Sequence, residues 1–297
     1  MRRFLASGGL AWVGGGILAL FFVLAGLAPV LAPYAPEAMD EPLLPPSPRH
    51  LLGTNDVGQD IFSELLYGAR LSLLAGGVSA IASTAIGLLV GAVAGYYDRL
   101  GFVLMRVVDV LLAVPRFPLI VFAAAFLRPS VWTLILFFIV FGWPCTCRVV
   151  RSHILKERKS AYVEAAISIG APDRRLIVRH LLPSAATLAL ARFVGEFQHV
   201  ILAEAGLSFL GLGDPTAKSW GMMLHYALDY PIIYISDLWM RWALPPGLCI
   251  TIVVLALTLV GFSFERQANP TLRGGGYGYG RAQTKTRRPE DPPTPAG

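Results

Sequence analysis

Six apolar stretches, each long enough to cross a lipid bilayer, constrain this chain more than any other feature of its sequence. A membrane-spanning helix needs about 20 mostly apolar residues. Because lipid offers no hydrogen-bond partners to the backbone, such stretches are expected to be helical. The sequence therefore predicts an all-α integral membrane protein with six transmembrane helices. The six stretches are 11–32, 71–95, 105–127, 131–149, 184–207 and 242–263.

Charged residues are scarce in this chain. They make up 15% of the 297 residues, whereas a soluble domain has about 25%. The net charge of +6 would suit nucleic acid, but Lys and Arg lie between the apolar stretches, as in membrane proteins. Lipid, and not nucleic acid, is the expected partner. The three cysteines, Cys145, Cys147 and Cys249, are predicted to be packing residues of the helices.

Lys and Arg gather in four segments that fall on one side of the membrane if the six stretches alternate. These segments are 2–3, 99–106, 148–179 and 273–288. The connections 33–60 and 211–238 are poor in Lys and Arg and fall on the other side. The positive-inside rule therefore predicts that both termini are cytoplasmic.

The same pattern divides the chain into segments. We expect a cytoplasmic N-terminus, a first helix, an extracytoplasmic segment, a core of five helices with one long loop, and a basic C-terminal tail that is disordered. In that order the segments are 1–10, 11–32, 33–70, 71–263 with the loop at about 150–183, and 264–297.

The long loop contains a predicted elbow of two short helices (residues 160–182). Residues 160–169 favour a helix, and Gly170 allows a sharp change of direction. Pro172 and Asp173 suit the first turn of a second helix, and Pro183 marks the return to the membrane. Such an elbow either docks in a groove of another protein or is an ordinary connection, and the residues alone leave both interpretations open.

A family resemblance favours docking. Glu164-Ala165-Ala166, then Gly170 and Leu182-Pro183, resembles the EAA motif of ABC importer permeases. Two further stretches, HLLGTNDVGQD at 50–60 and EAGLSFLGLG at 204–213, are similar to signatures of the dipeptide, oligopeptide and nickel branch, in its C-type subunit. Asn55 and Gln59 replace the Asp and Arg that are usual in the first signature.

The resemblance implies a type I ABC importer permease fold in the cytoplasmic (inner) membrane. The implied partners are a second homologous permease subunit, two ATPase subunits, an extracytoplasmic solute-binding protein and the lipid bilayer. The chain has no GxxxxGK[ST] motif, so it is expected not to be an enzyme and to bind no cofactor, with ATP and Mg²⁺ held by the ATPase subunits. The implied coupling residues are Glu164, Ala165, Ala166, Gly170, Ala171, Pro172, Asp173 and Arg174.

The fifth stretch carries three ionisable residues. Arg192, Glu196 and His199 are spaced to share one helix face. They either line the substrate path or form an internal Arg192–Glu196 pair that fixes helix packing, and both interpretations remain open. Arg106 and Asp109, three apart in the third stretch, are predicted to form a salt bridge. Glu164 is predicted to contact the ATPase or to pin the elbow to a basic residue such as Arg148.

The expected function is the inward translocation of di- and oligopeptides, driven by ATP hydrolysed in partner subunits that dock on the elbow. Nickel and oligosaccharides are the alternative cargoes. A channel or a secondary transporter is the alternative of another class, and a membrane enzyme using Glu196 and His199 as acid and base is a further one.

Overall fold

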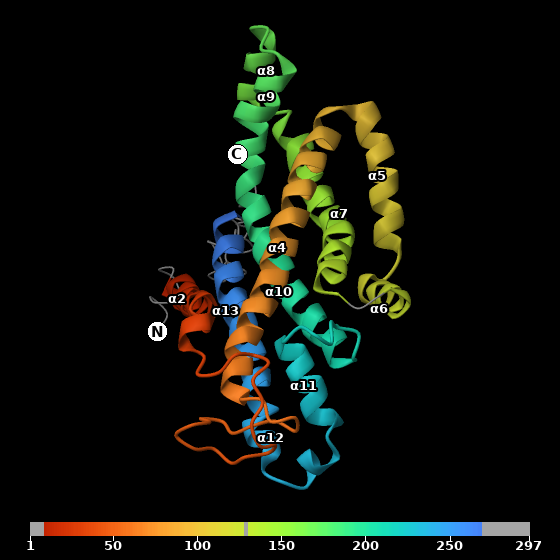
Figure 1. The fold of residues 1–297 in the computed structure, drawn as a ribbon. Coiled ribbons are helices and arrows are strands. Elements are labelled where there is room, and N and C mark those ends of the chain that lie inside the picture. The colour runs from red at the N-terminus through yellow and green to blue at the C-terminus, as the bar shows by residue number, and fades with distance from the viewer. Residues whose placement is uncertain (1–8, 128–129, 269–297) are drawn as a thin grey trace, which may run out of the picture.

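Five long helices dominate the computed structural model, which describes residues 9–127 and 130–268. All five are long and apolar enough to cross a membrane, and a bent pair of shorter helices raises the number to six within the described residues. This confirms the predicted helical membrane fold. The five are α2 (Gly9–Gly26), α4 (Ile61–Tyr96), α7 (Val131–Glu157), α10 (Leu182–Phe209) and α13 (Leu244–Ala268) (Figure 1).

Shorter helices connect the long ones or cap their ends. A π-helical turn at Ile177–Leu181 precedes α10, and a 3-10 turn at Pro231–Tyr234 follows α11. The α-helices among them are α3 (Ala28–Leu31), α5 (Asp98–Ala113), α6 (Arg116–Phe126), α8 (Ala161–Ser168), α9 (Asp173–Leu176), α11 (Trp220–Asp229) and α12 (Leu238–Arg241).

Helix α4 lies at the centre of the molecule and packs along α7 (Figure 1). Its 36 residues span about 54 Å at 1.5 Å per residue. Gly87, Gly91 and Gly95 recur every four residues on the face toward α7, and a Cβ on Gly91 would lie 2.7 Å from the Cys147 carbonyl oxygen. Small residues at this spacing let two backbones approach closely. About three turns nearer the start of α4, Gly76 admits the ring of Phe197 from α10.

Helix α4 begins at Ile61, well before the start of the second apolar stretch at residue 71. The Asp60 carboxylate caps it by accepting a hydrogen bond from the Ser63 N–H at 2.8 Å. A side-chain cap of this kind satisfies one of the free N–H groups of a first turn. The helix thus extends ahead of the predicted apolar stretch through residues 61–70, in which Ser63, Glu64 and Arg70 lie among apolar side chains.

The third apolar stretch, predicted to be a single helix, belongs to two helices instead. Helices α5 and α6 meet at 78°. Val114 and Pro115 have extended backbone between them, because proline cannot continue the hydrogen-bond ladder and disfavours helical geometry in the residue before it. The bend carries α6 away from the line of α5, at the edge of the bundle (Figure 1).

The predicted Arg106–Asp109 salt bridge within α5 is wrong. Asp109 pairs with Arg148 of α7, with Nη2 and Oδ1 2.5 Å apart. The Arg106 guanidinium lies over the Phe102 ring, 4.9 Å from its centroid. The correct pair joins two helices because α5 turns its Asp109 face toward α7, where the long side chain of Arg148 reaches it.

The two ends of the molecule differ in structure. The elbow, with α8 and α9, projects from one end, which we call the elbow end (Figure 1). The opposite end, which we call the loop end, carries residues 33–60 and 210–243. The predicted N-terminal segment lies almost entirely outside the described residues, as does the predicted tail from residue 269 onward.

The α4–α7 contact predicts a stability difference between two glycine substitutions. Gly91→Ala should destabilise the folded chain by about 1–3 kcal/mol, because a methyl group would overlap a backbone carbonyl that cannot rotate away. Gly195→Ala in α10 is the matched control, since no other atom lies within 4 Å of its added methyl group. Thermal unfolding of the two purified variants is the measurement, and equal midpoints would contradict the close contact.

Candidate functional site

The elbow exposes an apolar tip (residues 167–172). Helix α8 ends at Ser168. Two residues later, Gly170 has a φ of +79°, a left-handed conformation that glycine adopts without strain. The Ala171 N–H returns to the Ala166 carbonyl at 3.1 Å, which closes the helix end. Ile169 beside the corner is 85% exposed. An isoleucine held in the open by a rigid turn is suited to burial against another protein.

The inner side of the elbow is fixed to the bundle. Val163 of α8 and Leu181 before α10 are fully buried. Both belong to an apolar cluster with residues of α4, α7 and α10. The elbow is therefore an anchored arm with a projecting tip, not a loose connection.

The predicted coupling residues divide between tip and arm. Glu164, Ala165, Pro172 and Arg174 are exposed, and Ala166 and Ala171 are half-buried. Glu164 does not meet Arg148, which binds Asp109 instead. Asp173 turns back to the bundle, where its carboxylate accepts hydrogen bonds from the Tyr96 hydroxyl at 2.7 Å and the Tyr97 hydroxyl at 3.3 Å. No local pattern in the sequence pointed to these two tyrosines.

A buried ion pair lies between α6 and α10. The Arg116 guanidinium donates to both oxygens of Glu196, with Nη2–Oε1 at 2.5 Å and Nη1–Oε2 at 3.1 Å. Glu196 is 4% exposed. The Arg116 Nη2 also donates to the Phe138 carbonyl at 3.2 Å. Gly142 of α7 leaves the room for this pair, since a Cβ there would lie 2.5 Å from Glu196 Oε1.

The internal Arg192–Glu196 pair, one of the two interpretations of this face, is not formed. Arg192 donates instead to the Cys145 sulfur at 3.1 Å. Glu196 faces α6, where the planar fork of Arg116 matches both carboxylate oxygens. The α5–α6 bend places Arg116 at the start of α6 and so within reach of α10. Arg116 stands between two prolines in an apolar stretch, and a charge in such a place signals a buried partner.

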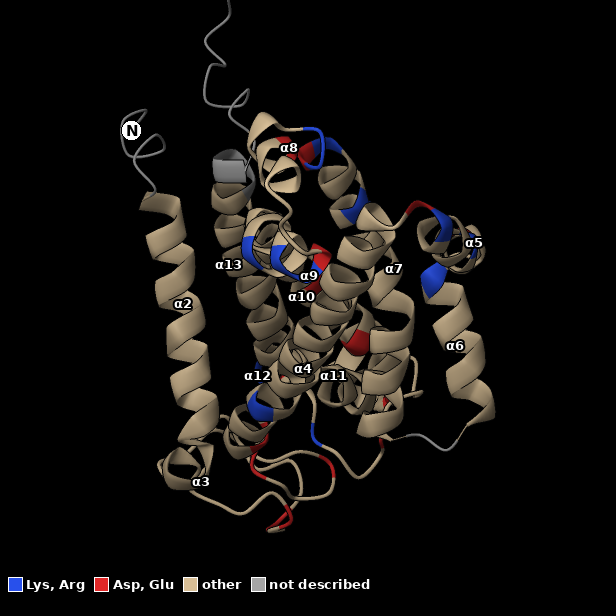
Figure 2. Ribbon diagram, turned by 90° about the horizontal axis from the view of Figure 1, so that it is seen from above, with Lys and Arg blue, Asp and Glu red and all other residues tan. Residues whose placement is uncertain are grey.

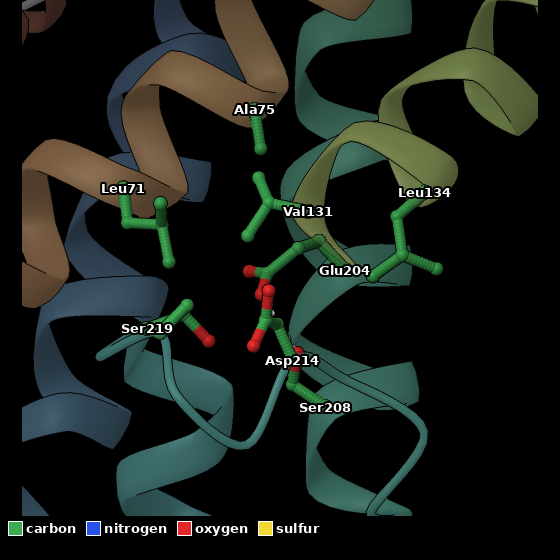
Figure 3. Close-up of a pocket in the computed structure, with 9 residues that line it drawn as sticks. Leu71, Ala75, Val131, Leu134, Glu204, Ser208, Asp214 and Ser219 are labelled. Atoms are coloured by element: carbon green, nitrogen blue, oxygen red, sulfur yellow. Dashed lines mark hydrogen bonds between the residues drawn. The ribbon is translucent and has the colours of Figure 1, made fainter. Parts of the chain in front are cut away.

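A second polar cluster lies nearer the loop end, around Glu204 (Figure 3). This buried carboxylate accepts hydrogen bonds from Ser72 at 3.2 Å and Ser208 at 2.8 Å. The Ser72 hydroxyl in turn accepts from the Trp220 N–H at 3.4 Å, so α10, α4 and α11 are joined. The Asp214 carboxylate points into the same small cavity (Figure 3), whose volume of about 10 Å³ is near the least that holds one water molecule.

The loop end has its own polar framework, built from the first family signature. His50 is buried, with Nδ1 2.9 Å from Asp60 and Nε2 3.4 Å from Asp40. The Tyr34 ring stacks on it at 4.7 Å. A backbone N–H from Glu41 and the contact with His50 lower the pKa of Asp40. These contacts fold segment 33–60 against the start of α4.

A further ion pair joins this segment to the loop before α11. Lys218 Nζ lies 2.7 Å from Glu64 of α4 and 2.6 Å from Gln59. Asn55 donates to both Gln59 and Glu64 at 3.2 Å. Asn55 and Gln59, the two departures from the family signature, are therefore both part of a buried hydrogen-bond network. Their partner Lys218 lies 159 positions away from Gln59, beyond what local sequence patterns can relate.

Comparison with known proteins gives two family matches and a set of relatives. The family described as "Binding-protein-dependent transport system inner membrane component" matches residues 83–274, and the "N-terminal TM domain of oligopeptide transport permease C" matches residues 1–46. The dipeptide transport system permease protein DppC of Bacillus subtilis is 34% identical over 275 residues, 91% of this chain and 85% of that protein. The di/tripeptide transport system permease protein DppC of Pseudomonas aeruginosa is 36% identical over 272 residues, 88% of each chain.

The two arginine–carboxylate pairs predict unequal effects of the same substitution. Arg116→Ala should cost about 3–5 kcal/mol, because Glu196 would stay buried without its counter-ion. Arg148→Ala is the matched control: it also breaks a pair between two helices, but that pair is half-exposed and contributes about 0–1 kcal/mol.

Unfolding of the purified chains in denaturant measures both losses. The double variant Arg116→Met with Glu196→Leu should recover most of the stability, since no unpaired charge remains. Equal losses for Arg116→Ala and Arg148→Ala would contradict a buried pair.

Proposed function

Because the chain belongs to the family of binding-protein-dependent transport system inner membrane components, we propose that it forms half of the membrane path of an ATP-driven peptide importer and receives mechanical work through its elbow. As a permease subunit of an ABC transporter it is a multi-pass protein of the inner membrane. The remaining points of the proposal are its cargo, the orientation of its ends and the residues that dock.

The exposed tip of the elbow supports ATPase docking most strongly. It presents Ile167 and Ile169 outside the bundle, while its arm is packed against α4 and α7. A partner groove that buries these side chains gains apolar contact area and can move the arm without unfolding it. The docking residues in this proposal are Glu164, Ala165, Ala166, Gly170, Ala171, Pro172 and Arg174.

Charge distribution supports a cytoplasmic elbow end. Lys and Arg lie around α8, α9 and the adjoining end of α7, whereas the loops beside α3 and α12 carry acidic residues (Figure 2). Positive charge marks the cytoplasmic side of membrane proteins. By this rule the loop end faces outward, both termini are cytoplasmic, and the solute-binding protein meets the loop end.

The remaining partners follow from the binding-protein-dependent system to which the family belongs. We propose a second homologous permease subunit, two ATPase subunits that hold ATP and Mg²⁺, and one external binding protein. This chain itself would bind no cofactor. A channel or secondary transporter would have no use for a projecting elbow, and an enzyme using Glu196 as its acid or base would first have to break the bidentate pair with Arg116.

Peptide is the favoured cargo over nickel or oligosaccharide, because the two named relatives are peptide permeases and each alignment covers most of this chain. Within the membrane, Arg192 is half-buried and His199 is exposed, and both lie on α10 within four residues of the buried Glu196. We propose that these two side chains face the peptide path, while Glu196 with Arg116 fixes the wall behind them.

Substitutions at the corner test the elbow. Gly170→Val should abolish ATP-dependent uptake in proteoliposomes, because a β-branched residue strongly disfavours a φ of +79°. Gly170→Asn should retain more uptake, since asparagine tolerates this region, and Gly170→Ala should fall between them. Glu164→Lys should also block uptake. All four variants should insert in the membrane at the wild-type amount; full uptake by Gly170→Val would rule out the elbow as the coupling site.

Cargo charge tests the path. Arg192→Ala should change the uptake of acidic and basic dipeptides by different factors, because it removes a charge beside the path while leaving the Arg116–Glu196 pair intact. Glu196→Gln is the comparison: it disturbs the wall and should reduce uptake of all dipeptides alike. The measurement is competition between labelled dipeptides of opposite charge, and a uniform loss in Arg192→Ala would assign Arg192 a structural role.

A further inference from the structure

We propose that Asp173 is a joint that fastens the elbow to α4, with Tyr96 and Tyr97 as its positioning partners, so that a pull on the elbow moves α4. This inference rests on the proposed docking of an ATPase at the tip. It changes the assignment of Asp173, which the family motif groups with the docking residues. The Asp173 side chain instead forms hydrogen bonds with tyrosines of the helix bundle.

Both oxygens of the Asp173 carboxylate accept hydrogen bonds at the end of α4, from its last residue Tyr96 and from Tyr97 directly after it. The Tyr96 hydroxyl donates to Oδ1 at 2.7 Å, and the Tyr97 hydroxyl donates to Oδ2 at 3.3 Å. The two rings meet edge to face, with centroids 4.9 Å apart. A tyrosine phenol has an ordinary pKa of about 10 and therefore donates at neutral pH, and partial desolvation and the Asp173 carboxylate raise the pKa of Tyr97 further.

The carboxylate is not occupied in capping its own helix. Asp173 is the first residue of α9, a helix of four residues, and the preceding residue makes no side-chain cap. An aspartate in a first turn usually serves the free N–H groups there. Here the hydrogen bonds are made with residues 76 and 77 positions earlier in the chain. Such long-range bonds are expected of a contact that connects the elbow to the end of α4.

A second contact holds the same turn of α4 from the side of α7. Arg158 donates to the Tyr96 carbonyl at 2.7 Å and pairs with Asp98 at 3.0 Å. Its guanidinium also lies over the Tyr96 ring, 5.6 Å from the centroid. Arg158 thus contacts the backbone and the ring of Tyr96, while Asp173 accepts a hydrogen bond from its hydroxyl. These contacts restrict movement of the elbow relative to α4.

The far end of α4 is connected as firmly. Glu64 pairs with Lys218, and Ser72 joins Glu204 of α10 to the first turn of α11. Helix α4 is continuous from Ile61 to Tyr96. A displacement applied at Asp173 is therefore transmitted along one rigid element to the polar clusters of the loop end.

The experiment compares uptake per ATP hydrolysed in the reconstituted complex of the permease chains, ATPase subunits and binding protein. The test variants are Asp173→Ala, Asp173→Asn and the double variant Tyr96→Phe with Tyr97→Phe. The matched control is Tyr162→Phe, which removes a hydroxyl that donates to Glu157 at the same 2.7 Å but does not reach α4. The amount of ATPase that copurifies with each variant is measured in parallel.

We expect Asp173→Ala and the double tyrosine variant to lower the uptake per ATP by about tenfold, since each removes hydrogen bonds to a charged group. Both should retain wild-type amounts of ATPase. Asp173→Asn keeps an acceptor and should recover part of the ratio, and Tyr162→Phe should keep the wild-type ratio.

Two results would contradict the proposed role of Asp173 as a joint. One is an unchanged ratio in the double tyrosine variant. The other is loss of copurified ATPase in Asp173→Ala alone, which would make Asp173 a docking residue. Failure of the docking proposal can be told apart from failure of the joint. If the tip does not dock, Gly170→Val keeps both its copurified ATPase and its uptake, whatever the Asp173 variants do.

Discussion

The close contact of α4 with α7 is the constraint on which the rest of the structure depends. Backbones approach closely at Gly87, Gly91 and Gly95 because no side chain separates them, and lipid supplies no hydrophobic force to hold helices together. The contact fixes the two helices whose ends receive the elbow. It also places Gly142 of α7 beside Glu196 of α10, where the missing side chain makes room for the Arg116 guanidinium.

Buried carboxylates are stabilised in two ways in the part of this chain that the structure describes. Glu196 and Glu64 each face a cation, Arg116 and Lys218, so the cost of removing the carboxylate from water is offset by a paired charge. Glu204 accepts hydrogen bonds from serine hydroxyls on its own helix and on α4. All three carboxylates join elements that lie far apart in sequence.

The sequence was sufficient for the helical membrane fold and for the elbow, because both follow from local rules. Apolar length predicts spans, and Gly170 between two short helical patterns predicts a corner, which the φ of +79° confirms. The partners of charged residues were not predictable in the same way. Local spacing suggested Arg106–Asp109 and allowed Arg192–Glu196, whereas the structure pairs Asp109 with Arg148 and Glu196 with Arg116. These choices depend on how the helices are rotated and placed relative to one another, which local spacing does not specify.

The division of the elbow into tip and arm has a mechanical reason. A residue that docks on a partner must be free to leave its own chain, whereas a residue that transmits force must stay bound to the element that moves. The exposed Ile169 meets the first requirement, and Asp173, bound by two tyrosine hydroxyls at the end of α4, meets the second. Gly170 separates the two functions: its left-handed turn directs the tip outward while letting the chain return to the bundle within a few residues. A motif defined by sequence alone combines both kinds of residue, because they lie within one short stretch of the chain. Their hydrogen bonds distinguish them: in the proposed mechanism, force enters beside Ile169 and passes to the membrane helices through Asp173.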